Sequence, residues 1–238
     1  MEPFTYQWTH ASVRDFWNAH SKIFSEGYAG LFLGKYVIQF AKKWAPLIGD
    51  ILDFGCGNGY LFTYLSDVNA RLYVADQNEA HVEAAKKCLS KQRNFAGGEV
   101  LSETFFKNNR NRFNICFLCE VLEHVLPDDL PTVIQNVYDL MAPQGHLIIA
   151  VPNRPDCNRL DSICPNCGAV YNSAQHHTAW NKEKLDQFTG SIGFRYIQAQ
   201  EKTFPGSANE PWFITLLKKC WNLYRYHHQP DLLYCCQK

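Results

Sequence analysis

A glycine-rich turn directly after a short apolar run is the feature that most constrains how this chain folds. Residues 51–59 read Ile-Leu-Asp-Phe-Gly-Cys-Gly-Asn-Gly, and residues 60–65 have a composition that suits the start of a helix. Glycines in such a turn tolerate positive φ and let a ligand lie against the main chain. A strand, a tight turn and a helix in this order are typical of open α/β sheets, which bind ligands at the carboxyl ends of their strands. The glycines of the turn are Gly55, Gly57 and Gly59.

The spacing of these glycines also indicates the ligand. A dinucleotide fingerprint reads Gly-x-Gly-x-x-Gly, but here Tyr60 occupies the last position, and no Gly-Lys-Ser/Thr follows to form a P-loop. A second apolar run ends in Asp76, about twenty residues past the turn, where a carboxylate can accept hydrogen bonds from a ribose diol. Asp53, just before the turn, would repel a pyrophosphate and attract a cation. S-adenosylmethionine has a ribose, no phosphate and a positive sulfonium, so it is the ligand we expect.

These residues resemble motifs I and II of the class I S-adenosylmethionine-dependent methyltransferases. The resemblance runs from about Ile51 to the end of the chain and is specific at residues 51–59, 74–76, 117–124 and 145–153. It implies a doubly wound, seven-stranded Rossmann-like α/β sheet with helices on both faces, whose last strand is antiparallel and lies between its two predecessors. It also implies a cofactor site over the glycine turn. The expected cofactor-binding residues are Asp53, Gly55, Cys56, Gly57, Gly59, Asp76, Gln77 and Cys119.

The length and charge of the chain limit its class further. Its 238 residues suit one domain with a sizeable core. Lys plus Arg number 23 and Asp plus Glu number 23, so the net charge is zero, whereas a nucleic-acid binder usually shows a basic excess. No apolar stretch has the length of a membrane span, and no secretory signal follows Met1. The ten cysteines then indicate reduced thiols, and we expect a cytoplasmic protein without membrane contact. No pattern indicates an oligomeric state.

Apolar runs and helix-forming stretches alternate along the chain, which favours a parallel sheet with helices on both faces. The expected strands are residues 50–54, 71–75, 99–102, 113–119, 145–151, 194–199 and 231–236. The expected helices are residues 12–26, 31–44, 59–66, 78–92, 128–141, 181–190 and 210–222.

The residues before the first strand are rich in aromatic side chains. They form either two helices that pack on the sheet or a lid that covers the substrate and excludes water. We divide the chain into an N-terminal helical cap at 1–45 and an S-adenosylmethionine-binding methyltransferase domain at 46–238, which contains a Cys/His-rich loop at 155–180. The candidates for a lid are Tyr6, Trp8, Phe16 and His20.

Two glutamates and a histidine follow the fourth apolar run. Glu120, Glu123 and His124 are offset by three and four residues, so they share one face of a helical turn. Two neighbouring carboxylates repel each other, and a bound divalent cation removes that penalty. Oxygen ligands with one imidazole suit Mg²⁺ or Mn²⁺, although Zn²⁺ or Fe²⁺ also fits. His176 or His177, in the loop after the fifth strand, is expected at the same edge of the sheet.

The Glu-x-x-Glu-His stretch is similar to that of ubiquinone-biosynthesis O-methyltransferases and of small-RNA 3′-end 2′-O-methyltransferases. The second group holds a metal with both glutamates, the histidine and a later histidine four residues before a tryptophan. The resemblance implies that Glu120, Glu123, His124 and His176 are metal ligands and catalytic residues, since Trp180 follows His176 at that spacing. The alternative is a metal-free site in which His124 is a general base or only packs, with the glutamates solvated.

A second cluster of metal-binding residue types lies in the Cys/His-rich loop. Cys164-Pro-Asn-Cys167-Gly has the Cys-x-x-Cys spacing of a zinc knuckle. Cys157 and one of the two adjacent histidines could complete a Cys₃His site, with His177 at the zinc while His176 serves the active centre. Such a zinc would stiffen the loop. The alternative is a pair of plain structural thiols.

The leading functional prediction is a methyltransferase that acts on a hydroxyl of a small-molecule substrate with help from a divalent metal or a histidine base. A hydroxyl acceptor needs such help more than an amine does. Two other interpretations remain: a 2′-O-methyltransferase for RNA 3′ ends, which the zero net charge disfavours, and a cofactor-binding partner protein without catalysis. The sequence does not name the methyl acceptor.

Overall fold

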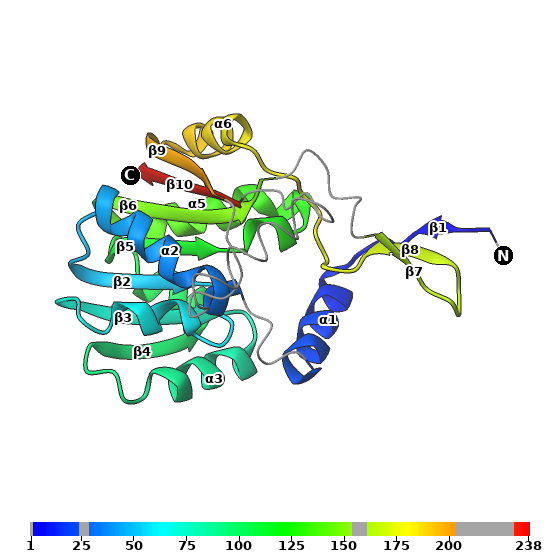
Figure 1. The fold of residues 1–238 in the computed structure, drawn as a ribbon, viewed down its shortest axis with the longest axis horizontal. Coiled ribbons are helices and arrows are strands. Elements are labelled where there is room, and N and C mark those ends of the chain that lie inside the picture. Colours follow the sequence, from blue (N-terminus) through cyan, green and yellow to red (C-terminus); the bar gives the residue numbers. More distant parts are fainter. Residues whose placement is uncertain (1, 24–28, 154–160, 203–230) are drawn as a thin grey trace, which may run out of the picture.

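The computed structural model describes residues 2–23, 29–153, 161–202 and 231–238. Its centre is a seven-stranded sheet covered by helices, and a smaller three-stranded sheet projects from it (Figure 1). The strands are β1 (Phe4–Thr5), β2 (Gly49–Phe54), β3 (Ala70–Asp76), β4 (Phe95–Val100), β5 (Phe113–Cys119), β6 (Met141–Pro152), β7 (Asp161–Ile163), β8 (Ala169–Asn172), β9 (Arg195–Lys202) and β10 (Asp231–Gln237). The helices are α1 (His10–Ile23), α2 (Ala29–Trp44), α3 (Glu79–Leu89), α4 (Glu103–Asn108), α5 (Leu130–Leu140) and α6 (Lys182–Ile192), and the short 3₁₀ helices are η1 (Tyr60–Leu65), η2 (Leu122–His124) and η3 (Pro127–Asp129).

The strand order of the large sheet positions the site. It runs β4-β3-β2-β5-β6-β10-β9, with β10 antiparallel to both of its neighbours and the other pairings parallel. The expected seven-stranded sheet with an inserted antiparallel last strand is therefore confirmed. The order reverses between β2 and β5, because the chain moves outward from β2 to β4 and then returns to the other side. Ligands of doubly wound sheets bind beside the carboxyl ends of the strands at such a switch point.

Both faces of the large sheet are buried, which explains the nearly continuous apolar runs of its strands. Neighbouring residues of a strand enter different cores: Ile51 packs into the cluster that includes α2, η1 and α3, whereas Leu52 packs into the cluster that includes α5 and α6. Ile115 and Cys116 of β5 alternate in the same way. Because alternate side chains of each strand are buried on opposite faces of the sheet, the strands form a rigid base for the loops at their carboxyl ends.

The N-terminal helices have different surroundings. α2 packs into the core through Val37 and Phe40, but α1 has no buried residue. α1 stands between the large sheet and the small sheet, which we call the arm (Figure 1). The arm consists of β1 paired in parallel with β8 and of β7 paired antiparallel with β8. The first residues of the chain are thereby tied to the loop that follows β6.

Several elements differ from the sequence-based expectation, and the strands of the arm, β1, β7 and β8, are not among the expected strands. The strand expected at 99–102 is β4 at Phe95–Val100, and the unexpected helix α4 follows because the Ser102 hydroxyl accepts a hydrogen bond from Phe105 N at 3.1 Å and caps it. Gly98 suits β4 because a Cβ there would lie 2.6 Å from Val74 Cγ2. The stretch 59–66 forms the 3₁₀ helix η1 rather than an α-helix, and the helix expected at 210–222 lies outside the described residues. Within the described parts of the chain, no helix is both long enough and apolar enough to cross a membrane.

Candidate active site

A cavity of about 700 Å³ lies at the switch point of the large sheet. Its walls come from the glycine turn after β2, the carboxyl ends of β3 and β5, the start of α5 and the inner side of α1. The expected residues Asp53, Asp76, Gln77, Cys119 and Glu120 all line it. The structure thus brings together, around one cavity, residues from segments that are far apart in the sequence.

The glycine turn is shaped by backbone geometry and by close packing. Gly55 and Gly59 both have φ near 77°, which only glycine adopts without strain. A Cβ on Gly55 would lie 2.6 Å from Val121 Cγ2, and one on Gly59 would lie 2.9 Å from Ala85 Cβ. The turn is fixed to β3, because the amide groups of Gly55 and Cys56 donate to Ala75 O at 2.8 and 3.1 Å. Main chain rather than side chain therefore forms this wall of the cavity.

Three contacts hold the carboxylate of Asp76 in place at the end of β3. Its Oδ2 accepts from Gly57 N at 3.0 Å, and its Oδ1 accepts from Asn78 N at 2.9 Å. The Nδ1 atom of the buried His81 ring lies 3.2 Å from the same Oδ1. His81 also lines the cavity, and the sequence analysis missed it. The available signal was its position on the first turn of the helix after Asp76.

Asp53 is buried at the end of β2, with 2% of its surface exposed. Burial and, to a lesser extent, the charge of Asp76 raise the pKa of Asp53 to about 8. The carboxyl group is therefore mostly protonated at neutral pH in the unliganded chain. A cation bound in the cavity would favour its ionised form.

Glu123, His124 and His176 form a compact cluster beside the cavity. One ligand atom from each lies within 4.8 Å of the others, and across the described residues this is the one group of at least three potential metal ligands. His124 Nε2 lies 3.9 Å from Glu123 Oε1, and the rings of His124 and His176 are 4.8 Å apart between centroids. Ligands of one zinc ion sit about 2.0–2.2 Å from it, hence up to about 4 Å apart, so a small contraction would fit an ion. Glu120 lines the cavity but is not part of this group.

Hydrogen bonds between two loops create this cluster. His177 N donates to Glu123 O at 2.7 Å, and Gln175 Nε2 donates to His124 O at 3.0 Å. Asn172 Oδ1 accepts from His176 N at 3.1 Å and shapes the turn that precedes it. Burial, followed by the neighbouring His176, lowers the pKa of His124 to about 3, so its imidazole is neutral. Neutral imidazole is the form that binds metals.

α1 covers the cavity through polar contacts at its N-terminal end and at its middle. His10 Nε2 lies 2.8 Å from Asp129 Oδ2, and Asn78 Nδ2 donates to Asn18 Oδ1 at 2.9 Å. Trp17 Nε1 donates to the Oε1 atom of Gln175 at 2.7 Å. These contacts join one helix to η3, to the start of α3 and to the loop after β8.

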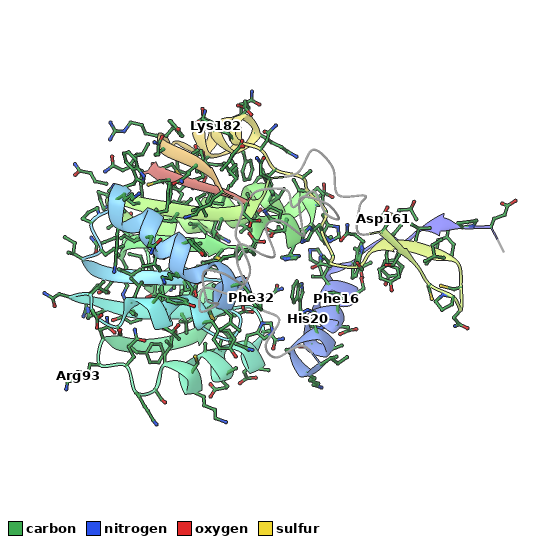
Figure 2. All side chains as sticks on the ribbon, viewed as in Figure 1. Phe16, His20, Phe32, Arg93, Asp161 and Lys182 are labelled. Carbon is green, nitrogen blue, oxygen red and sulfur yellow. The ribbon has the colours of Figure 1, made fainter. Side chains whose placement is uncertain are left out.

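Aromatic side chains of the N-terminal segment form the inner layer of this cover. Phe16 and His20 lie on the side of α1 that faces the large sheet, and both line the cavity (Figure 2). Trp8 contacts Phe16 at 5.6 Å and His177 at 5.8 Å between ring centroids, in each case edge to face. Trp17 contacts His124 in the same way at 4.8 Å. The N-terminal aromatic residues thus contact two histidines directly: His177, and His124 of the Glu123–His124–His176 cluster.

The two knuckle cysteines lie at the turn of the β7–β8 hairpin. Cys164 N donates to Ala169 O at 2.8 Å, Gly168 N donates to Cys164 O at 2.9 Å, and Gly168 has φ 76°. Backbone N–H groups of Asn166 and Cys167 lower the pKa of the Cys164 thiol. Among the described residues, no group of potential metal ligands joins His177 to these cysteines, and its Nε2 atom instead lies 2.6 Å from Gln175 Nε2. Cys157 lies outside the described residues.

The comparisons with known proteins concern the family and the fold of the chain. A family model described as a methyltransferase domain matches residues 27–199. Among curated relatives, the ubiquinone biosynthesis O-methyltransferase of Rhodopseudomonas palustris (strain BisB5) is 31% identical over 116 residues, which cover 48% of this chain and 44% of the relative. That of Bradyrhizobium diazoefficiens is 29% identical over 105 residues, which cover 44% of this chain and 40% of the relative. The matching segment therefore spans less than half the length of either relative.

Solved structures share the fold. The 1,6-didemethyltoxoflavin-N1-methyltransferase of Burkholderia thailandensis, with bound 1,6-didemethyltoxoflavin and S-adenosylhomocysteine, matches with a TM-score of 0.65 at 14% identity and covers 99% of this chain and 93% of that chain. A SAM-dependent methyltransferase from Archaeoglobus fulgidus matches with a TM-score of 0.59 at 17% identity, over 94% and 99% of the two chains. At these identities the likeness shows the fold alone.

The fold, the glycine turn and the family match together define the class: this is a class I S-adenosylmethionine-dependent methyltransferase. Within that class, the chain belongs to the family whose model is described as a methyltransferase domain, and it is distantly similar to ubiquinone biosynthesis O-methyltransferases.

Proposed function

We propose that this enzyme transfers the methyl group of S-adenosylmethionine to a hydroxyl of a small molecule. The observation that carries the proposal is the charge of the cavity. Its described lining residues include no Lys or Arg but include four acidic residues, Asp53, Asp76, Glu120 and Asp129. A nucleic-acid acceptor would bring phosphates, which proteins usually meet with Lys and Arg. A small acceptor without negative charge suits this wall better.

The cofactor-binding roles proposed from the sequence fit the cavity. Asp76 accepts hydrogen bonds from the ribose, and Gln77 lies beside the adenine. The main chain of Gly55–Gly59, with Cys56, carries the cofactor across the turn, while Cys119 flanks its methionine portion. Asp53 faces the positively charged sulfonium of the cofactor. The support is that Asp53, Gly55, Cys56, Gly57, Asp76, Gln77 and Cys119 line the cavity, and that Gly59 closes the turn against Ala85.

A divalent metal held by Glu120, Glu123, His124 and His176 is the proposed aid to catalysis. The fit rests on the compact spacing of three ligand atoms and on the burial of Glu123, which is 1% exposed. Bound there, a divalent cation would lower the pKa of the acceptor hydroxyl. Without a metal, an imidazole of the same cluster would take the proton. The aromatic cover excludes water from the reacting atoms, and the cavity walls hold acceptor and cofactor in line.

An RNA 3′-end 2′-O-methyltransferase is the second candidate. The favouring observation is the same cluster, since the family resemblance gives these positions to a metal that binds a terminal ribose. The cavity charge disfavours it. An electrophoretic shift with a short single-stranded RNA decides between the two candidates.

We also propose that Cys164 and Cys167 supply two ligands of a structural zinc, completed by Cys157 and His177. The hairpin turn, with its backbone N–H groups directed at the Cys164 sulfur, supports a thiolate site. Because Nε2 of His177 contacts Gln175, this histidine could reach a zinc there only by leaving that contact.

The proposed function is tested by product formation with defined acceptors. The purified chain is incubated with S-adenosylmethionine and either catechol or 3,4-dihydroxybenzoate, and S-adenosylhomocysteine release is measured with Mg²⁺ and with EDTA. We expect release with the neutral acceptor to exceed release with the carboxylate. Preference for the anionic acceptor would contradict the charge argument.

A further inference from the structure

Gln175 joins α1 to the loop that carries the histidine cluster, although it does not line the cavity. Its side chain is fully buried, and its backbone has φ 57°, a left-handed conformation that is uncommon outside glycine. Such a conformation persists only where the surrounding contacts hold it. Gln175 is therefore fixed on all sides by the residues it touches.

Trp17 and the His124 carbonyl specify the same orientation of the Gln175 amide. The indole Nε1 can only donate, and it lies 2.7 Å from Oε1, so the amide nitrogen must face away from α1. That nitrogen has two hydrogens to donate, and it lies 3.0 Å from His124 O and 2.6 Å from His177 Nε2. Both hydrogens are thus used. His177 accepts at Nε2, which leaves its neutral ring with the hydrogen on Nδ1.

His124 is linked to Gln175 in both directions. The His124 carbonyl accepts from the amide, and His124 Nδ1 lies 3.4 Å from Gln175 O. The indole of Trp17 also packs edge-on against the His124 ring, at 4.8 Å between centroids. α1 therefore reaches His124 by two routes, one direct and one through the Gln175 amide.

We propose that Gln175 is a positioning residue that couples the seating of α1 over the cavity to the orientation of His124 and His177. With α1 in place, Trp17 fixes the amide, and the amide fixes the main chain of His124 and the ring of His177. If α1 moves away, Oε1 loses its donor, and only the two donated hydrogen bonds still hold the amide. His124 and His177 are then oriented less firmly, so their arrangement depends on the cover of the cavity. The inference rests on the proposed function, which gives His124 and His176 their role.

Two substitutions separate the parts of this linkage. Gln175→Glu keeps the size of the side chain and an acceptor for Trp17 but removes both donated hydrogen bonds. Trp17→Phe keeps an aromatic ring against His124 but removes the N–H donor. The matched control is Gln92→Glu, because the Gln92 amide also donates twice, to Phe62 O at 3.1 Å and to Asn94 Oδ1 at 3.0 Å, and does not line the cavity.

The first measurement needs no metal. In ¹⁵N spectra of the histidine rings, we expect wild-type His177 as the neutral tautomer protonated at Nδ1. Both Trp17→Phe and Gln175→Glu should shift the resonances of His124 and His177 and leave those of His146, on β6, unchanged. Gln92→Glu should shift none of them. Unchanged His124 and His177 resonances in Trp17→Phe would overturn the coupling.

The second measurement is Mn²⁺ affinity, titrated by electron paramagnetic resonance. We expect Gln175→Glu to weaken Mn²⁺ binding about 10- to 100-fold, the usual effect of losing a partner that orients a ligand. Binding of S-adenosylhomocysteine should stay within about twofold of wild type. An equal loss of Mn²⁺ affinity in Gln92→Glu would mean that only stability is affected and would overturn the proposal. If the wild-type chain binds no Mn²⁺, the metal part of the proposed function fails, while the histidine spectra still decide the coupling.

Discussion

At the scale of a single residue, we expect Asp53 to make cofactor binding depend on pH. Its pKa is raised from 3.8 to about 8 in the unliganded chain, so the folded state binds a proton that the unfolded state releases near pH 3.8. Stability contributed by this group therefore falls as pH rises between these values. A cationic ligand needs the ionised carboxylate, so binding must release the proton at neutral pH.

We expect the affinity for S-adenosylmethionine to rise with pH, by up to about tenfold per unit below pH 8. Calorimetry in two buffers of different ionisation enthalpy should show proton release on binding. Asp53→Asn should remove this release and lower the affinity, whereas Asp67→Asn, at an exposed aspartate, should change neither. Proton release that persists in Asp53→Asn would assign it to another group.

Asp76 is the residue on which recognition of the ribose depends in our proposal. Because hydrogen bonds to a charged group each contribute about 1.5–3 kcal/mol, Asp76→Ala should weaken S-adenosylhomocysteine binding by at least about tenfold. The substitution also removes the acceptor of the hydrogen bond from Gly57 N, so it loosens the glycine turn as well. Unchanged binding in calorimetry would contradict the ribose assignment.

At the scale of elements, η2 and the loop after β8 act as one unit. Glu123→Ala should abolish any dependence of activity on divalent metal, because it removes the one carboxylate of the described cluster. Glu83→Ala, on the exposed side of α3, is the matched control. Full wild-type activity in EDTA would end the metal hypothesis.

The β7–β8 hairpin carries a separate prediction. Cys164→Ser should lose about one zinc per chain in elemental analysis, since thiolates are the ligands that zinc needs there. Cys88→Ser, at an exposed cysteine of α3, should keep the metal. A wild-type preparation that contains no zinc would remove this site.

The elements near the site differ in how well the sequence predicts them. β2, β5 and the glycine turn follow from local patterns, because apolar runs and glycine spacing are properties of neighbouring residues. The arm does not follow from local patterns. Phe4 pairs with Ala169, which lies far away in the sequence, and the strands of the arm are too short to give a pattern. Gln175 was missed for a similar reason: its role depends on Trp17, more than 150 residues earlier.

At the scale of the whole molecule, stability depends on the two cores on either side of the sheet. Phe117 is fully buried on β5 and contacts Phe62 at 6.0 Å between ring centroids. Phe117→Ala should lower the free energy of unfolding by about 3–5 kcal/mol. Ile48→Ala, at a residue that is 58% exposed, should change it by less than about 0.5 kcal/mol. Urea unfolding measures both, and similar losses in the two variants would contradict this view of the core.

The position of β10 has a consequence for how the molecule is made on the ribosome. Among the described strands, β9 pairs with β10 alone, and β10 also covers the edge of β6. Until residues 231–237 have been synthesised, β6 presents an open hydrogen-bonding edge, and β9 lacks the one sheet partner that the described residues give it. A polypeptide that ends before residue 231 should thus self-associate through the open edge of β6 instead of folding as a smaller enzyme.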